Sequence, residues 1–224
     1  DAEGRLRGRS YSEFPQYYPR PGWVEHDAEE ISQVTVKVCA AALQRAGVEA
    51  RALTALGITN QRETTVLWDR HTGKPVHRAI VWQCRRSAAI CTALREAGAE
   101  SMVRAKTGLL LDAYFSASKL RWIFQQSPDL HRRAMAGDLC FGTVDSWLIW
   151  RLTGGRSHLT DHTNACRTLL YDLDRREWDS ELLDLFDCPS AILPEIRPSA
   201  GVFAHTDPEA FFGAEIPIAG VAGD

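Results

Sequence analysis

The chain has 224 residues with 45% hydrophobic content, and its 26 lysines and arginines against 29 acids give a formal charge of −3, so neither nucleic acid nor an anionic membrane is expected as a partner. No run approaches the roughly 20 apolar residues that span a bilayer, and the opening residues lack the apolar core of a signal peptide. The six cysteines form no Cys-x-x-Cys pair, which favours reduced thiols and a cytoplasmic location.

The first part of the chain predicts a loop, a helix and then strands. The charged opening residues predict a turn that leads into a strand, and the proline- and glycine-rich stretch at 15–23 predicts an ordered loop. Residues 27–47 predict an amphipathic helix with Asp27 as its N-cap and Gly47 as its stop. Strands are predicted next, at residues 53–59, 64–69 and up to 81–82, with a hairpin turn at 71–75.

The remainder of the chain predicts mainly helices. They are expected at residues 85–97, 100–106, 116–125, 129–135, 144–152 and 179–186, with strands at 139–142 and 216–222. Interleaved strands and helices of this kind predict a layered α/β domain. Because the chain stops directly after an apolar run, where a core strand would continue into a loop, we expect it to be a fragment of a longer protein.

A run of polar residues between two predicted strands is the first candidate for a binding site. Residues 57–65 include Arg62, which offers a fork of hydrogen-bond donors, and Glu63, which offers an acceptor. At the end of a strand, this pair suits a polyol that binds in the crevice of a sheet. A hairpin corner with solvated charges would explain the same run.

Three further residues could contribute to a polyol site. Trp82 ends a predicted strand, and its indole face could cover the carbon side of a small polyol. Tyr114 offers a phenolic hydroxyl just before a predicted helix with Ser116 as N-cap. Asp224 follows a glycine at the tip of an apolar strand and could take a proton from a hydroxyl nucleophile. A core tryptophan, a surface tyrosine and a turn-forming aspartate are the competing interpretations.

Other short motifs do not predict chemistry. Residues 72–75 lack the earlier glycine and the following helix of a phosphate loop. His158 and His162 have the spacing of helical metal ligands, but no third ligand is evident, so we expect no metal bound by protein side chains alone. No cysteine has a nearby histidine, and covalent catalysis therefore has no support.

Taken together and in order, several runs resemble the glycerol kinases of the FGGY family of carbohydrate kinases, over nearly the whole chain. The runs lie at residues 18–27, 57–65, 73–75, 79–86, 141–150 and 160–165. Long matches at several separate places are more specific than any single short motif.

The resemblance implies a ribonuclease H-like domain of the actin and hexokinase superfamily, with a mixed sheet and flanking helices. Residues 1–224 would be the N-terminal, glycerol-binding domain, without the family's first strand and phosphate loop and without its second, nucleotide-binding domain. The parent enzyme would phosphorylate glycerol with ATP and Mg²⁺, as a cytoplasmic homodimer or homotetramer, and this fragment would be inactive alone.

The resemblance also assigns site residues. Arg62, Glu63, Trp82, Tyr114 and Asp224 match the family's glycerol-binding positions, and Asp224 matches the catalytic base. Cofactor-binding residues stay unassigned.

Some positions depart from the family pattern. Ala113 replaces a common proline and Cys166 a common serine, and we expect both changes to be tolerated. Glu215 stands where bacterial relatives carry an arginine for inhibition by fructose 1,6-bisphosphate, so this regulation is expected to be weak or lost. The alternatives are a kinase for another polyol or ketose, such as xylulose or gluconate, a non-catalytic relative that acts as a binding module, and a folded but inert fragment.

Overall fold

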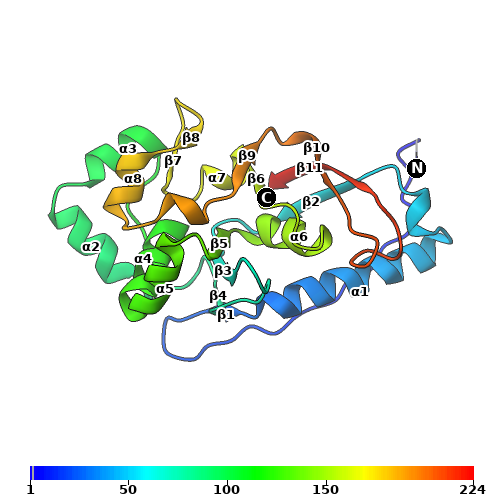
Figure 1. The fold of residues 1–224 in the computed structure, drawn as a ribbon, viewed down its shortest axis with the longest axis horizontal. Coiled ribbons are helices and arrows are strands. Elements are labelled where there is room, and N and C mark those ends of the chain that lie inside the picture. Colours follow the sequence, from blue (N-terminus) through cyan, green and yellow to red (C-terminus); the bar gives the residue numbers. More distant parts are fainter. Residues whose placement is uncertain (2) are drawn as a thin grey trace.

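The computed structural model describes residue 1 and residues 3–224, and Figure 1 shows an elongated molecule with most helices at one end and the largest sheet at the other. The predicted opening turn includes Ala2, which lies outside the described residues. The C-terminus lies near the middle of the molecule, where the two ends meet (Figure 1).

Helices and strands are interleaved along the chain, often in runs of several elements of one kind. The helices are α1 (Ala28–Ala46), α2 (Ala88–Glu96), α3 (Glu100–Thr107), α4 (Ser116–Gln126), α5 (Pro128–Met135), α6 (Val144–Leu152), α7 (His162–Ala165) and α8 (Ser180–Leu185), with short 3₁₀ turns at Ala50–Ala52 and Ser190–Ile192. The strands are β1 (Glu25–His26), β2 (Leu56–Asn60), β3 (Val66–Asp69), β4 (Ala79–Ile80), β5 (Leu139–Gly142), β6 (Leu159–Asp161), β7 (Tyr171–Asp172), β8 (Glu177–Trp178), β9 (Glu195–Arg197), β10 (Ala200–His205) and β11 (Pro217–Gly223).

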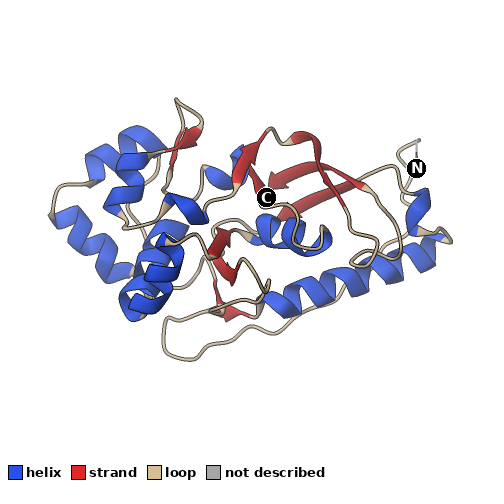
Figure 2. Ribbon diagram, in the orientation of Figure 1, coloured by secondary structure: helices blue, strands red, loops and turns tan. Residues whose placement is uncertain are grey.

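The largest sheet is mixed, which confirms the predicted arrangement. Strand β11 lies in its centre, antiparallel to β10 and parallel to β2. Smaller pairs surround it: β3 with β5 and β1 with β4 are antiparallel, and β6 with β9 is parallel. Figure 2 shows α1 running along the length of this sheet region.

Local sequence explains the long helix α1. The side chain of Asp27 accepts the backbone N–H groups of Glu29 and Glu30, as an N-cap does, and Gly47 ends the helix with φ of 66°. The predicted helix at 27–47 is therefore confirmed, and α6 has the predicted bounds.

Two predictions near chain turns are wrong. No strand follows the opening residues in the described part of the chain: Tyr17 forms only an isolated bridge with Glu25, where β1 begins. Ser116 is not the N-cap of α4, because it is already the first helical residue and its hydroxyl donates instead to the backbone carbonyl of Glu63.

Two main hydrophobic cores support the fold. The helical core is formed by buried side chains from α2–α5, α8 and β3–β5, among them Leu120, Ile123 and Phe141. The sheet core lies between α1, α6 and the mixed sheet, with Ile149, Ile218 and Val221 among its buried residues. Most predicted core tryptophans are buried, and Trp68 and Trp147 are fully inaccessible.

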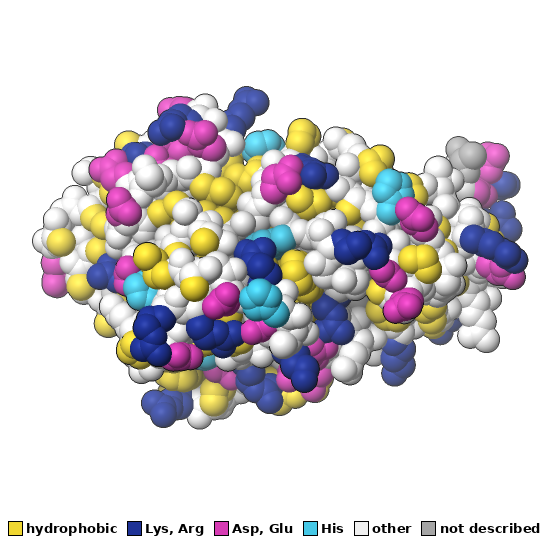
Figure 3. Space-filling view, in the orientation of Figure 1, with side chains coloured by type: hydrophobic (Ala, Val, Ile, Leu, Met, Phe, Trp, Pro, Cys, Tyr) yellow, Lys and Arg dark blue, Asp and Glu magenta, His cyan; other side chains and the backbone are white. Residues whose placement is uncertain are grey.

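The surface carries charges of both signs. On the face shown in Figure 3, acidic and basic side chains are interspersed rather than separated into patches. The six cysteines are free. Across residues 1 and 3–224, each helix is too short or too polar to cross a membrane.

Candidate functional site

The tips of two neighbouring parallel strands bring the first two predicted site residues together. Gly223 of β11 lies opposite Asn60 of β2, and the backbone N–H of Asp224 donates to the carbonyl of Asn60 across 3.2 Å. This register places the Asp224 carboxylate beside Arg62, with 3.6 Å between Oδ1 and Nε. The Asp224 side chain is 66% exposed, so the carboxylate is open to a ligand.

Gly223 allows this close approach. A Cβ atom at position 223 would lie 2.2 Å from Cδ of Arg62, well inside contact distance, so only glycine permits the arginine side chain to cross the strand here. Nε of Arg62 is buried and has no hydrogen-bond partner among the described residues. This buried donor lies beside the Asp224 carboxylate, so Arg62 can pair with Asp224 at the strand tips.

Glu63 is held in an unusual conformation beside a second arginine. Its φ of 63° lies in the left-handed region that side chains other than glycine rarely adopt, and the residue is 2% exposed. Its Oε1 accepts Nε of Arg167 at 2.7 Å. The other carboxylate oxygen makes no bond to Arg167 and could accept a ligand hydroxyl.

The two aromatic candidates also contact each other. The ring centroids of Trp82 and Tyr114 are 5.4 Å apart, and both side chains pack partly buried against the helical core. The guanidinium of Arg167 lies 5.8 Å from the Tyr114 ring and 5.0 Å from the Phe115 ring, consistent with cation–π contacts.

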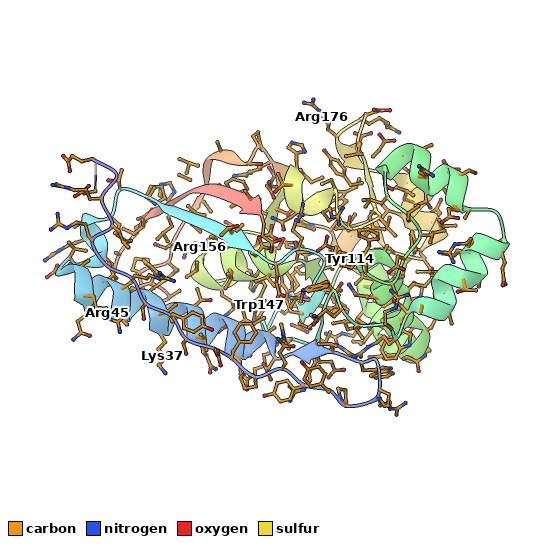
Figure 4. The ribbon with its side chains drawn as sticks, turned by 180° about the vertical axis from the view of Figure 1, so that it is seen from behind. Lys37, Arg45, Tyr114, Trp147, Arg156 and Arg176 are labelled. Atoms are coloured by element: carbon orange, nitrogen blue, oxygen red, sulfur yellow. The ribbon has the colours of Figure 1, made fainter. Side chains whose placement is uncertain are left out.

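The five predicted site residues form two groups of contacts, which meet at the consecutive residues Arg62 and Glu63. Asp224 faces Arg62, Arg167 joins Glu63 to Tyr114, and Tyr114 touches Trp82. Figure 4 shows Tyr114 near the boundary between the helical end and the sheet end of the molecule. A guanidinium, two carboxylates and two aromatic rings can together bind a small molecule with several hydroxyls. The individual roles of these residues stay predictions.

A buried polar network lies behind the strand tips. The carboxylate of Asp161, which is inaccessible to solvent, accepts the hydroxyls of Thr163 at 2.7 Å and Ser199 at 2.6 Å. Thr163 Oγ1 in turn accepts the backbone N–H of Gly223 at 2.7 Å, and Asn60 donates to Asn164 across 3.0 Å. The network connects α7 to the ends of both strands that carry the site.

Sequence reasoning missed Arg167 and the network at 160–165. The run at 160–165 contributed to the family resemblance, but no role was assigned to it. Arg167 stands shortly before the buried apolar pair Leu169 and Leu170. An arginine next to a buried run was the sequence signal that could have indicated its role.

Among the described residues around the site, there is neither a reactive thiol nor a set of side chains that could bind a metal ion. Burial raises the pKa of the Cys166 thiol, so this neighbour of Arg167 stays protonated near neutral pH. Within the described residues, no group of three or more His, Cys, Asp or Glu side chains is arranged to hold a metal ion. His158 Nε2 donates to the Phe141 carbonyl of β5 across 2.7 Å, while His162 Nδ1 lies 2.8 Å from the Tyr171 hydroxyl, so the two histidines do not converge.

Comparison with known proteins gives the chain's relatives. Residues 1–224 match the model of the N-terminal domain of the FGGY family of carbohydrate kinases. The chain is 57% identical to a glycerol kinase of Methylobacterium nodulans over 98% of its own length and 44% of that protein. It is also 57% identical to a glycerol kinase of Alcanivorax borkumensis over 100% of its length and 45% of that protein. The chain thus spans less than half the length of these relatives.

Solved structures confirm the predicted fold class. A Plasmodium falciparum glycerol kinase crystallised with ADP superposes with a TM-score of 0.84 at 33% identity, over 94% of this chain and 42% of that one. A gluconate kinase of Lactobacillus acidophilus gives the same TM-score of 0.84 at 20% identity, over 95% and 42% of the two chains, which shows the shared fold alone.

Proposed function

Because the chain belongs to the FGGY family of carbohydrate kinases, we propose that the intact protein transfers the γ-phosphoryl group of ATP to glycerol and forms glycerol 3-phosphate. The observation that carries this proposal is the meeting of Asp224 and Arg62 at the tips of β11 and β2, 3.6 Å apart. A base beside a cation is what the attack of a hydroxyl on a phosphoryl group needs.

In the proposed reaction, the Asp224 carboxylate accepts the proton of a terminal hydroxyl of glycerol. The hydroxyl oxygen then forms a bond to the γ-phosphorus, while the bond between that phosphorus and the β–γ bridging oxygen breaks and ADP leaves. The proton stays on the carboxyl group until the product departs. A positioned general base of this kind contributes roughly 10²–10⁴-fold to the rate.

The other site residues would bind and orient glycerol. Arg62 would donate to its hydroxyls, and Glu63, held by Arg167, would accept from them. Trp82 would cover the carbon side and Tyr114 would add a phenolic hydroxyl. Fixing the alcohol in this way supplies the orientation that phosphoryl transfer depends on.

Residues 1–224 would be the glycerol-binding domain. Other parts of the intact protein would bind most of the nucleotide. The relatives extend well beyond the matched region, and one of them was crystallised with ADP. Mg²⁺ would arrive with the ATP phosphates, where it neutralises charge. The isolated chain is therefore expected to show no turnover. The homodimer or homotetramer and the cytoplasmic location stay predictions.

The test is ADP release by the intact protein with glycerol, xylulose and gluconate as separate substrates. The proposal expects the highest kcat/KM with glycerol. A higher value with the pentulose would favour the alternative of another polyol or ketose kinase. No substrate-dependent ADP release at all would favour a non-catalytic binding module.

A further inference from the structure

A fully buried lysine links two parts of the candidate site. Lys119 of α4 has no exposed surface, and its Nζ donates to the backbone carbonyl of Glu63 at 3.0 Å and to the backbone carbonyl of Tyr114. It forms no ion pair with any described residue. Burial lowers the pKa of Lys119 to about 7, because the low-dielectric interior disfavours the ammonium form.

Burial of this ammonium is unfavourable by itself. Taking a charged group out of water without a paired carboxylate is unfavourable, and an apolar side chain of similar length would avoid this cost. The compensating role of Lys119 must therefore lie in the contacts that its Nζ makes.

These contacts are not needed merely to satisfy the carbonyl of Glu63. That oxygen also accepts the hydroxyl of Ser116 at 3.2 Å and the hydroxyl of Thr65 at 3.3 Å, and a carbonyl has two lone pairs. The lysine adds a third donor, which joins the Glu63 backbone to the Tyr114 backbone. The bond therefore acts as a link between two segments.

The link reaches a strained backbone. Glu63 has φ of 63°, which is unfavourable for an L-residue, and such a conformation persists only where its surroundings impose it. Lys119 and Ser116, both from the first turn of α4, bind its carbonyl. Arg167 binds its carboxylate.

We propose that Lys119 is a positioning residue that fixes Glu63 and Tyr114 relative to each other and thereby sets the affinity of the site for its polyol. It touches neither the substrate nor the reacting atoms and acts through the two residues that do. The inference rests on the proposed function, because the affinity in question is that for glycerol.

The test compares Lys119→Met with the unsubstituted intact protein. Methionine has a similar length and no donor, so the link is lost with little change in volume. We expect the KM for glycerol and the Kd for glycerol measured by calorimetry to rise roughly ten- to hundred-fold, the usual effect of misplacing a binding group. The KM for ATP should change by no more than about two-fold, because no contact of Lys119 faces the nucleotide.

Ser118→Ala is the matched control. Ser118 is also fully buried in α4, and its hydroxyl lies 2.9 Å from that of Ser87, away from Glu63. This change removes the bond to Ser87 and the longer bond of 3.5 Å to the Phe115 carbonyl, but neither contact of Lys119. It should leave the KM for glycerol unchanged.

A second variant covers the case in which Lys119→Met does not fold. Ser116→Ala removes one smaller donor from the Glu63 carbonyl and should raise the KM for glycerol about two- to five-fold, again without an effect on the KM for ATP. A glycerol KM that stays unchanged in the folded variants would overturn the inference, as would equal rises in both KM values. Absence of glycerol turnover in the unsubstituted protein would instead overturn the proposed function, and the inference with it.

Discussion

The backbone N–H of Gly223 donates to the hydroxyl of Thr163 across 2.7 Å, and that hydroxyl donates in turn to Asp161. The bond fixes the peptide between Ala222 and Gly223 at the end of β11, one peptide before Asp224. Thr163 therefore holds in place the backbone that presents the proposed base.

Loss of the Thr163 hydroxyl should lower turnover. In Thr163→Val, the N–H of Gly223 loses its partner, and we expect kcat to fall roughly ten-fold while the KM for glycerol changes little. Thr163→Ser keeps the hydroxyl and should restore most of the rate. Steady-state kinetics of the intact protein check both. If valine and serine behave alike, the hydroxyl does not position the strand tip.

The proposed base can be tested directly with Asp224→Asn. The amide keeps the shape but cannot accept the proton, so kcat should fall by roughly two to four orders of magnitude. Glycerol affinity, measured by calorimetry, should be preserved because Arg62, Glu63 and the aromatic pair remain. Undiminished turnover would remove Asp224 from the mechanism.

Removal of Arg167 should affect both binding and stability. The Glu63 side chain is only 3% exposed, so Arg167→Met leaves a buried carboxylate without its partner. We expect the free energy of unfolding to fall by about 2 kcal/mol and the KM for glycerol to rise. Urea denaturation and kinetics of the intact protein measure these effects.

A matched double variant separates the two effects. In Arg167→Met with Glu63→Gln, the uncompensated charge is gone, so most of the lost stability should return while glycerol binding stays weak. Equal stability of the single and double variants would contradict a buried, uncompensated charge at Glu63.

Acid should destabilise the protein partly through His158. Burial lowers the pKa of His158 to about 4, although its bond to the Phe141 carbonyl acts in the opposite direction. Between about pH 4 and 6.5, His158 is protonated in the unfolded chain but neutral in the folded chain. Stability therefore falls as pH falls through this range. From pH 7.5 to pH 5, His158 alone should lower the free energy of unfolding by about 2 kcal/mol.

Urea denaturation at these two pH values, in the intact protein and in His158→Gln, isolates this contribution. Glutamine can keep a donor to Phe141 but does not titrate, so the variant should lose less stability on acidification. The buried Asp145, whose pKa is raised to about 6 mainly by burial, acts with the opposite sign but equally in both proteins. Identical pH dependence of the two proteins would exclude His158 as a source.

Inhibition by fructose 1,6-bisphosphate is expected to be weak in the intact protein. Glu215 is exposed just before β11, where its negative charge would repel a bisphosphate. Titration of activity with the bisphosphate checks this, and Glu215→Arg should strengthen any inhibition. Tight inhibition of the unsubstituted protein would show that the prediction is wrong.

The fold was largely predictable where local signals are strong. Capping residues and apolar periodicity located α1 and α6, because these depend on neighbours within a few positions. The strands β6 to β9 were not predicted, since two- and three-residue pairings depend on distant partners rather than on local pattern. The six-residue strand β10 was not predicted either.

The site residues likewise divide into those that local sequence predicted and those that depend on the fold. Arg62 and Glu63 were found because polar residues followed a predicted strand. Lys119 was not, because a lysine in a helix is ordinarily solvated, and its burial arises only when α4 packs over the turn at Glu63. Arg167 likewise becomes part of the site only through the fold.

The candidate site lies between two cores that pack separately. Tyr114 and Trp82 rest on the helical core, whereas Asp224 follows the strand that fills the sheet core. A bound triol that contacts both sides would act as a bridge between two bodies, and its release would remove that bridge. Amide hydrogen exchange along α4 and the end of β11 should therefore slow together when glycerol is present.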